Sequence, residues 1–154
     1  MADAGRVIAG SARGIRLAGP GPGTRPLADR VKQTLFAILE PDLRGALVLD
    51  LFAGSGAAGI EALSRGSARA VFVEHDARAA AAIRANLEAT RLADRGEVVR
   101  SDVLRYLGSA TDAFDVVVLD PPYADRESLD RTLAALAGET APLAPDARVV
   151  AKHF

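Results

Sequence analysis

The sequence contains no cysteine and only two histidines among its 154 residues. Without cysteine it can form neither disulfides nor thiolate metal sites, and two histidines are too few for a histidine-based metal centre unless carboxylates join them. No apolar run approaches the roughly 18–20 residues that a membrane-spanning helix needs. The first residues also lack the basic and then apolar pattern of a secretion signal. We therefore expect a cytoplasmic protein that uses neither a metal nor a membrane.

The charge of the chain is small but unevenly distributed. The net charge is −1, yet residues 6–32 contain six basic residues and one acidic residue, whereas residues 33–154 contain 13 basic and 18 acidic residues. A basic arm on an acidic body can attract a polyanion such as RNA while the total charge stays near zero. A solvated, flexible terminus would have the same composition. The charge pattern alone leaves both interpretations open.

Strands and helices alternate from residue 46 onward. The predicted strands are 46–51, 69–74, 97–101, 115–120 and 147–152, and the predicted helices are 57–65, 76–92 and 126–137. Runs such as 116–119 are apolar on both faces, which is what a parallel sheet covered by helices on each side requires. The length fits one domain of this kind. The sequence therefore predicts an α/β fold with a doubly wound, mostly parallel, Rossmann-like sheet.

The N-terminal part has a different pattern. Two short apolar pieces within residues 6–18 flank a glycine-containing turn, which predicts a small β-hairpin with arginines on its outer face. Glycine and proline dominate residues 19–26 and predict a loop. A helix is then expected to begin with Asp29 as N-cap and to end before Pro41. We divide the chain into a basic extension, 1–26, that contacts RNA, and a second unit, 27–154.

A glycine-rich turn follows the first predicted strand of the sheet. Gly54, Gly56 and Gly59 match the pattern G-x-G-x-x-G, and Glu74 ends the next strand 20 residues after Gly54. Glycine is needed where the backbone takes positive φ or approaches a ligand closely, and a carboxylate at the second strand tip can accept both hydroxyls of a ribose. Dinucleotide-binding and S-adenosylmethionine (SAM)-binding folds share this pattern, and a chance glycine-rich turn also fits it.

Two further carboxylates favour SAM. Asp50 lies four residues before Gly54, where it would repel a pyrophosphate but attract an ammonium or sulfonium group. Asp102 follows the third predicted strand and could accept a hydrogen bond from the adenine amine. For each acidic residue, a strand-end cap or a surface charge remains the alternative interpretation.

The sequence Asp120-Pro121-Pro122-Tyr123 follows the fourth predicted strand. An exocyclic amine of a nucleobase is a poor nucleophile because its lone pair is delocalised into the ring. Two acceptors on its hydrogens, Asp120 and the Pro121 carbonyl whose direction the next proline fixes, would localise that pair. Tyr123 can stack on the base. The motif predicts transfer of a methyl group to such an amine, with positioning lowering much of the barrier.

With these motifs in hand, the chain resembles the class I SAM-dependent methyltransferases. More closely, it resembles the RsmD-type bacterial family, which methylates a guanine N2 amine of 16S ribosomal RNA. The resemblance runs from Arg6 to about Val150. The segments that carry it are Arg6-Val-Ile-Ala-Gly, Thr24-Arg-Pro-Leu-Ala-Asp-Arg-Val-Lys-Gln-Thr-Leu-Phe, Asp50-Leu-Phe-Ala-Gly-Ser-Gly, Glu61-Ala-Leu-Ser-Arg-Gly and Asp120-Pro-Pro-Tyr.

The resemblance implies roles for particular residues. The catalytic residues would be Asp120, Pro121, Pro122 and Tyr123. The SAM-binding residues would be Asp50, Phe52, Gly54, Gly56, Glu74, Asp102 and Val103, with Thr24 and Asp29 beside the methionine end of the cofactor or the target base. The RNA-contacting residues would be Arg13, Arg16, Arg25 and Arg30. The partner would be ribosomal RNA or a small-subunit assembly particle, the protein would act as a monomer, and no metal is implied.

The resemblance also implies two further strands after the one that ends near Lys152. The sequence stops at Phe154 and is therefore expected to lack this C-terminal hairpin.

Three alternative functions stay open. A DNA adenine-N6 methylase would use the same catalytic motif. An RNA assembly factor could retain a SAM pocket without catalysis. A nicotinamide-dependent oxidoreductase fits less well, because Asp50 suits the wrong ligand charge and no second domain carries the substrate.

Overall fold

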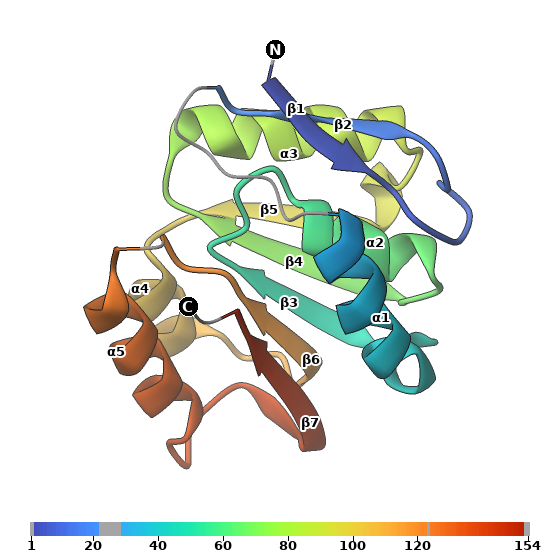
Figure 1. Ribbon diagram of the computed structural model, residues 1–154. Coiled ribbons are helices and arrows are strands. Elements are labelled where there is room, and N and C mark those ends of the chain that lie inside the picture. Colours follow the sequence, from blue (N-terminus) through green and yellow to red (C-terminus); the bar gives the residue numbers. More distant parts are fainter. Residues whose placement is uncertain (1, 22–28, 123, 153–154) are drawn as a thin grey trace.

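A computed structural model describes residues 2–21, 29–122 and 124–152. The central element is a five-stranded parallel sheet in the order β5-β4-β3-β6-β7, beside a two-stranded antiparallel hairpin of β1 and β2 (Figure 1). The strands are β1 Ala2–Arg6, β2 Arg16–Gly19, β3 Leu47–Leu51, β4 Arg69–Glu74, β5 Gly96–Arg100, β6 Phe114–Leu119 and β7 Leu143–Ala151. The helices are α1 Asp29–Leu43, α2 Ala57–Ser64, α3 Ala77–Ala89, α4 Val103–Ser109 and α5 Arg126–Leu136, with a short 3-10 turn at Ala93–Arg95. The predicted α/β fold with an N-terminal hairpin is confirmed.

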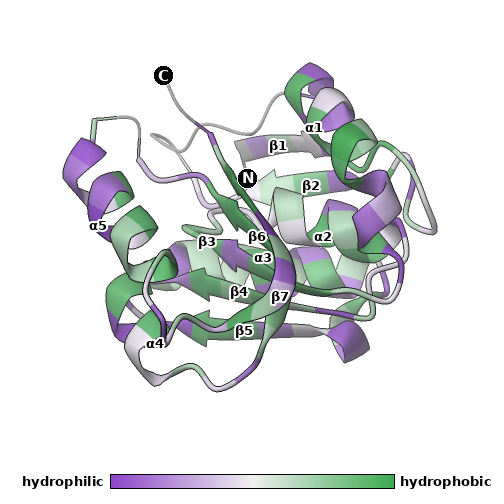
Figure 2. Ribbon diagram, turned by 90° about the horizontal axis from the view of Figure 1, so that it is seen from below, coloured by the Kyte–Doolittle hydropathy of each residue, from purple (hydrophilic) through white to green (hydrophobic). Residues whose placement is uncertain are grey.

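The sheet separates two hydrophobic cores, because successive side chains of a strand point to opposite faces. Val48 and Phe72 pack with α1, α2, α3 and the hairpin, whereas Leu49 and Val71 pack with α4 and α5. Figure 1 shows these two helical layers on either side of the sheet. In Figure 2 the strands of the parallel sheet are mostly hydrophobic, whereas α5 carries both hydrophilic and hydrophobic residues. The apolar runs predicted as buried strands are thus covered on both faces.

Several local predictions differ from the structure. Strand β1, Ala2–Arg6, largely precedes the segment 6–18 that was predicted to form the hairpin. Helix α1 continues through Pro41 to Leu43, because burial of Leu43 in the core outweighs the backbone hydrogen bond that proline removes. Strand β7 begins at residue 143 rather than 147. Helix α4 was not predicted, although Asp102 caps it by accepting from the Arg105 amide at 3.1 Å. Its two buried residues, Val103 and Leu107, lie four positions apart, which is the helical signal that sequence reasoning missed.

The hairpin is fixed to the body by buried polar side chains of α2. The Glu61 carboxylate accepts from the backbone amides of Ile8 and Ala9, at 2.9 and 3.1 Å. The Ser64 hydroxyl donates to the Ala9 carbonyl at 2.6 Å and accepts from the Ala12 amide at 2.9 Å. Because these contacts fix the backbone of its turn, the described part of the N-terminal arm is a docked element and not a flexible terminus.

Two further features fix the hairpin. Gly10 has a φ of +91°, and a Cβ there would lie 1.9 Å from the Ser64 carbonyl oxygen, so the turn requires glycine. On α3, the buried Asn86 accepts from the Ala18 amide at 2.8 Å and donates to the Ala18 and Ser55 carbonyls at 2.8 and 2.9 Å. Asn86 therefore links strand β2 to the glycine turn. The predicted unit boundary at residue 26 lies outside the described residues.

Candidate active site

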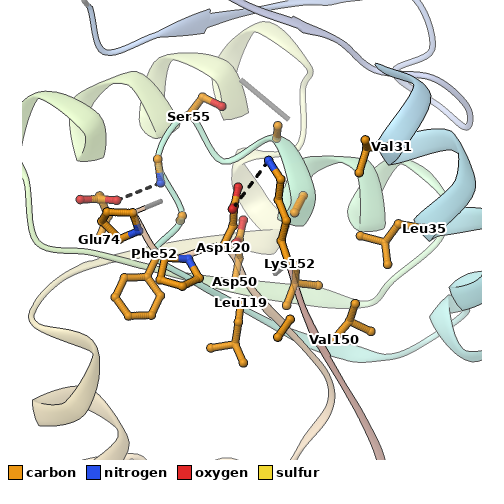
Figure 3. Close-up of a pocket in the computed structure, with 18 of the residues that line it drawn as sticks. Val31, Leu35, Asp50, Phe52, Ser55, Glu74, Leu119, Asp120, Val150 and Lys152 are labelled. Atoms are coloured by element: carbon orange, nitrogen blue, oxygen red, sulfur yellow. Dashed lines mark hydrogen bonds and ion pairs between the residues drawn. The ribbon is translucent and has the colours of Figure 1, made fainter. Parts of the chain in front are cut away.

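A cavity of about 470 Å³ opens at the carboxyl ends of β3, β4, β6 and β7. In open α/β sheets this edge is where ligands bind. Its lining includes Asp50, Phe52 and Gly54 after β3, Glu74 at the end of β4, Asp120, Pro121 and Pro122 after β6, and Lys152 after β7. Strands β3 and β6 are direct neighbours, with Leu51 paired to Leu119. The two predicted motifs therefore face one cavity from adjacent strand tips (Figure 3).

The glycine turn is held by Glu74. One carboxylate oxygen accepts from the Gly54 amide at 2.9 Å, and the other accepts from the Asp76 amide at 2.9 Å. Phe52 and Gly54 take positive φ values of 58° and 59°, which bend the chain sharply after the strand. Because both oxygens are anchored, the Glu74 side chain is oriented before any ligand binds, and its remaining lone pairs are available to hydroxyl donors.

Asp50 lies deeper in the same site and is 2% exposed. One of its oxygens accepts from the Gly59 amide in the first turn of α2, at 2.9 Å. Burial raises the pKa of Asp50 well above its ordinary value, and the neighbouring Asp120 and Glu74 raise it further, while the Gly59 hydrogen bond acts in the opposite direction. Keeping Asp50 ionised in this buried, acidic site costs free energy, and a cationic ligand bound beside it would lower that cost.

Asp120 stands at the tip of β6, where its amide donates to the Leu51 carbonyl at 3.4 Å. Burial raises the pKa of Asp120, and Lys152, whose Nζ lies 4.0 Å from an Asp120 oxygen, partly opposes this. The Pro122 carbonyl accepts from the Asp125 amide at 2.9 Å, which closes the turn after the diproline. The turn thus holds a carboxylate at the mouth of the cavity.

The charge around the cavity is mainly negative. The acidic residues that line it are Asp50, Glu74, Asp76 and Asp120, and the basic ones are His75 and Lys152. Such a lining favours a ligand with positive groups and repels a pyrophosphate. Among the described residues, no group of three or more metal-ligating side chains is gathered, and no helix is long and apolar enough to cross a membrane.

Other predicted site residues lie elsewhere in the described structure. Gly56 is the N-cap of α2, where a Cβ would lie 3.0 Å from Ile83. Asp102 is exposed and caps α4, and Val103 is buried in the core beneath that helix. Neither of these two lines the cavity. Asp29 forms ion pairs with Arg6 at 3.6 Å and Lys32 at 3.9 Å.

The predicted RNA-contacting arginines are exposed where they are described. These are Arg13 in the hairpin turn, Arg16, which pairs with Asp3 at 3.3 Å, and Arg30 in α1. Thr24, Arg25 and Tyr123 lie outside the described residues. Sequence reasoning missed Val31, Leu35 and Lys152, which also line the cavity. Val31 and Leu35 lie in the helix predicted after Asp29, and Lys152 lies at the end of the last predicted strand, so their local pattern indicates only a structural role.

Comparison with known proteins gives a consistent result. A family model described as "Conserved hypothetical protein 95" matches residues 5–153. The Bacillus subtilis protein named "Putative rRNA methyltransferase YlbH" is 40% identical over 152 residues, which cover 96% of this chain and 82% of that protein. "Ribosomal RNA small subunit methyltransferase D" of Escherichia coli is 42% identical over 132 residues, which cover 85% of this chain and 66% of that protein, just under two thirds.

A solved structure has the same fold. The protein described as "Putative methyltransferase yhhF from Escherichia coli" superposes with a TM-score of 0.83 and 39% sequence identity, covering 96% of this chain and 81% of that one. The residues matched by the family model, 5–153, include the turn of the hairpin, the glycine turn and the Asp-Pro-Pro turn. The comparisons therefore bear on every element that surrounds the cavity.

Proposed function

Because the chain belongs to the RsmD-type family described as conserved hypothetical protein 95, we propose that it transfers a methyl group from SAM to the exocyclic N2 amine of a guanine in 16S ribosomal RNA. The observation that carries this proposal is the meeting of the glycine turn and Asp120-Pro121-Pro122 at one cavity. The protein would act in the cytoplasm as a monomer, on ribosomal RNA or on an assembling small-subunit particle.

The lining of the cavity fits SAM in charge. SAM supplies an electrophilic methyl group on a positively charged sulfur, together with an ammonium group. The acidic lining formed by Asp50, Glu74 and Asp120 favours those cations, and the spare lone pairs of Glu74 suit ribose hydroxyls. The proposed cofactor-binding residues that line the cavity are thus Asp50, Phe52, Gly54 and Glu74. The roles of Gly56, Asp102, Val103, Thr24 and Asp29 stay predictions.

Asp120 would act on the target amine. Its carboxylate accepts a hydrogen bond from one N–H, and the Pro121 carbonyl accepts from the other, so that the nitrogen lone pair is directed into the cavity. As the nitrogen bonds to the methyl carbon, the bond from that carbon to the sulfonium sulfur would break and leave a neutral thioether. The nitrogen then carries an extra proton, which Asp120 or water can accept. Tyr123 would stack on the base, and Arg13, Arg16, Arg25 and Arg30 would contact phosphates outside the cavity.

A methyl-transfer assay tests the proposal. The protein is incubated with methyl-labelled SAM and either unmodified 16S RNA or small-subunit particles, and the modified nucleotide is then mapped. We expect label on a guanine N2 position. Label on adenine N6 in duplex DNA would instead support the DNA methylase. SAM binding with no transfer to any of these substrates would support the assembly factor, and binding of NAD in preference to SAM would overturn both methylase interpretations.

The raised pKa of Asp50 predicts that SAM affinity depends on pH. A bound cation favours ionised Asp50, so binding should release protons at pH values below the raised folded-state pKa. SAM affinity should therefore rise with pH and level off once Asp50 is ionised in the free protein. Calorimetric titrations in buffers of different ionisation enthalpy measure the released protons. In Asp50→Asn, which keeps an oxygen for the Gly59 amide, the Asp50 contribution should disappear; an unchanged release would contradict this assignment.

A further inference from the structure

The cavity contains a cation that the proposed reaction does not yet use. In the parallel pairing of β6 with β7, Leu119 lies opposite Ala151, so Asp120 and Lys152 are the next residues beyond the two strand tips. The Lys152 amide donates to the Leu119 carbonyl at 2.9 Å, which extends the ladder past the last pair. The Lys152 side chain then turns toward Asp120, and its Nζ lies 4.0 Å from the Asp120 carboxylate (Figure 3).

The surroundings of Asp120 make this placement chemically important. On β3 and β4 the charged groups that line the cavity are acidic, namely Asp50 and Glu74. On the α1 side the lining is apolar, from Val31 and Leu35. The other ionisable residues nearby are His75, which pairs with Glu74 at 3.4 Å, Asp76, which caps α3, and Asp125, which caps α5. Among the described residues that line the cavity, Lys152 is the only lysine or arginine.

We propose that Lys152 is a positioning residue for methyl transfer, whose ammonium group holds the Asp120 carboxylate ionised and directed at the target amine. This inference rests on the proposed function, in which Asp120 accepts a hydrogen bond from that amine. A protonated carboxyl group would present an O–H donor to the amine instead of a second acceptor oxygen. Burial favours that unproductive form, and the ammonium of Lys152 opposes it.

The side chains of the pair are partly buried, with exposures of 24% for Lys152 and 32% for Asp120. At such a site the attraction is screened less than on an open surface, yet the lysine can still be replaced without leaving a fully buried charge. A substitution at Lys152 should therefore change the titration of Asp120 without unfolding the protein. This makes the inference accessible to direct measurement.

The test compares Lys152→Met, Lys152→Arg and the wild type. The titration of the Asp120 carboxyl carbon is followed by NMR, with and without SAM, and single-turnover methyl transfer is measured against pH at saturating RNA. In Lys152→Met we expect the pKa of Asp120 to rise by about one unit. The acidic limb of the rate profile should move by the same amount, so that the rate on that limb falls about tenfold. Lys152→Arg should restore both values.

Arg148→Met provides a matched control. Arg148 is a cation within β7, the strand that Lys152 follows. It pairs with Asp42 at 3.4 Å and lies outside the cavity lining, so its removal should leave the Asp120 titration unchanged. An Asp120 titration in Lys152→Met that matches the wild type would overturn the inference, as would a rate loss that is equal at all pH values or lies wholly in RNA affinity. If the wild type transfers no methyl group to RNA, the proposed function fails, and the NMR titration still decides whether Lys152 holds the Asp120 carboxylate ionised.

Discussion

Replacing Asp120 by alanine should reduce single-turnover methyl transfer to RNA by about 10²- to 10³-fold. The substitution removes the side-chain acceptor at the cavity mouth, so the amine lone pair stays delocalised in the base. The anchored groups on the other side of the cavity, Asp50 and Glu74, remain in place. SAM affinity should therefore stay within a few-fold of the wild type, which equilibrium binding can measure beside the transfer rate.

Two variants sharpen this prediction. Asp120→Asn keeps a carbonyl oxygen as acceptor but cannot titrate, so its rate should lie between those of the wild type and Asp120→Ala and lose the acidic limb that Asp120 causes. Asp112→Ala removes an exposed carboxylate from the loop before β6, at the opposite end of the same strand, and should leave the transfer rate unchanged. Undiminished transfer by Asp120→Ala would show that the carboxylate has no part in activating the amine.

The meeting of the two motifs could be predicted from the sequence, because the argument needed only strand ends. Continuous apolar runs predict parallel strands, and the carboxyl ends of parallel strands share one edge of the sheet. Asp50, Glu74 and Asp120 each follow such a run, and the structure places all three around one cavity. The RsmD-type resemblance and the fold class, which rest on the same motifs, are confirmed.

The contacts that dock the hairpin could not be predicted in this way. Glu61, Ser64 and Asn86 bind backbone groups that lie 52 to 68 positions away in the sequence, and no local pattern indicates such partners. On a helix, these residues look like ordinary polar positions. At Pro41 a local signal was present but did not decide the structure. Proline usually ends a helix, yet α1 continues to Leu43 because the side chain of Leu43 is buried in the core.

Lys152 and Asp102 show how position at a strand end leaves the role undecided. Both follow strands of the same sheet, yet Lys152 lines the cavity, whereas Asp102 is exposed and caps α4. Strands β5 and β7 are the two edge strands of the sheet, and each lies beside a strand whose tip lines the cavity. What differs is the direction of the side chain: Asp102 accepts from the Arg105 amide at the start of α4, whereas the ammonium of Lys152 lies 4.0 Å from Asp120. The local sequence around a strand end does not indicate which of these partners a side chain takes.

Glu61→Ala should lower the free energy of unfolding by about 3–5 kcal/mol, the range found when one partner of a buried charge pair is removed. Glu61 is 0% exposed, accepts from two hairpin amides, and bonds the Arg65 guanidinium at 2.9 Å. Its carboxylate also lies 3.9 Å from the ammonium of Lys32, whose side chain is fully buried. The substitution leaves the two hairpin amides without their acceptor and removes one of the two carboxylates, Glu61 and Asp29, that lie 3.9 Å from the buried ammonium. Urea unfolding at neutral pH measures the loss.

The design of the control and the pH dependence make the Glu61 prediction specific. Glu40→Ala removes the other, 54% exposed, carboxylate that pairs with Arg65 and should cost about 1 kcal/mol or less.

Burial lowers the pKa of Lys32 and Glu61 opposes this, so without Glu61 the folded-state pKa of Lys32 falls further. Between the lowered folded-state pKa of Lys32 and its ordinary value, the unfolded state binds more protons than the folded state, so the free energy of unfolding rises with pH. This pH interval is wider in Glu61→Ala than in the wild type. The loss of unfolding free energy in Glu61→Ala should therefore become smaller as the pH rises toward the ordinary pKa of lysine. Adding Lys32→Met to Glu61→Ala should recover part of that loss. A deficit equal to that of Glu40→Ala, or one independent of pH, would mean that Glu61 does not compensate a buried charge beneath the hairpin.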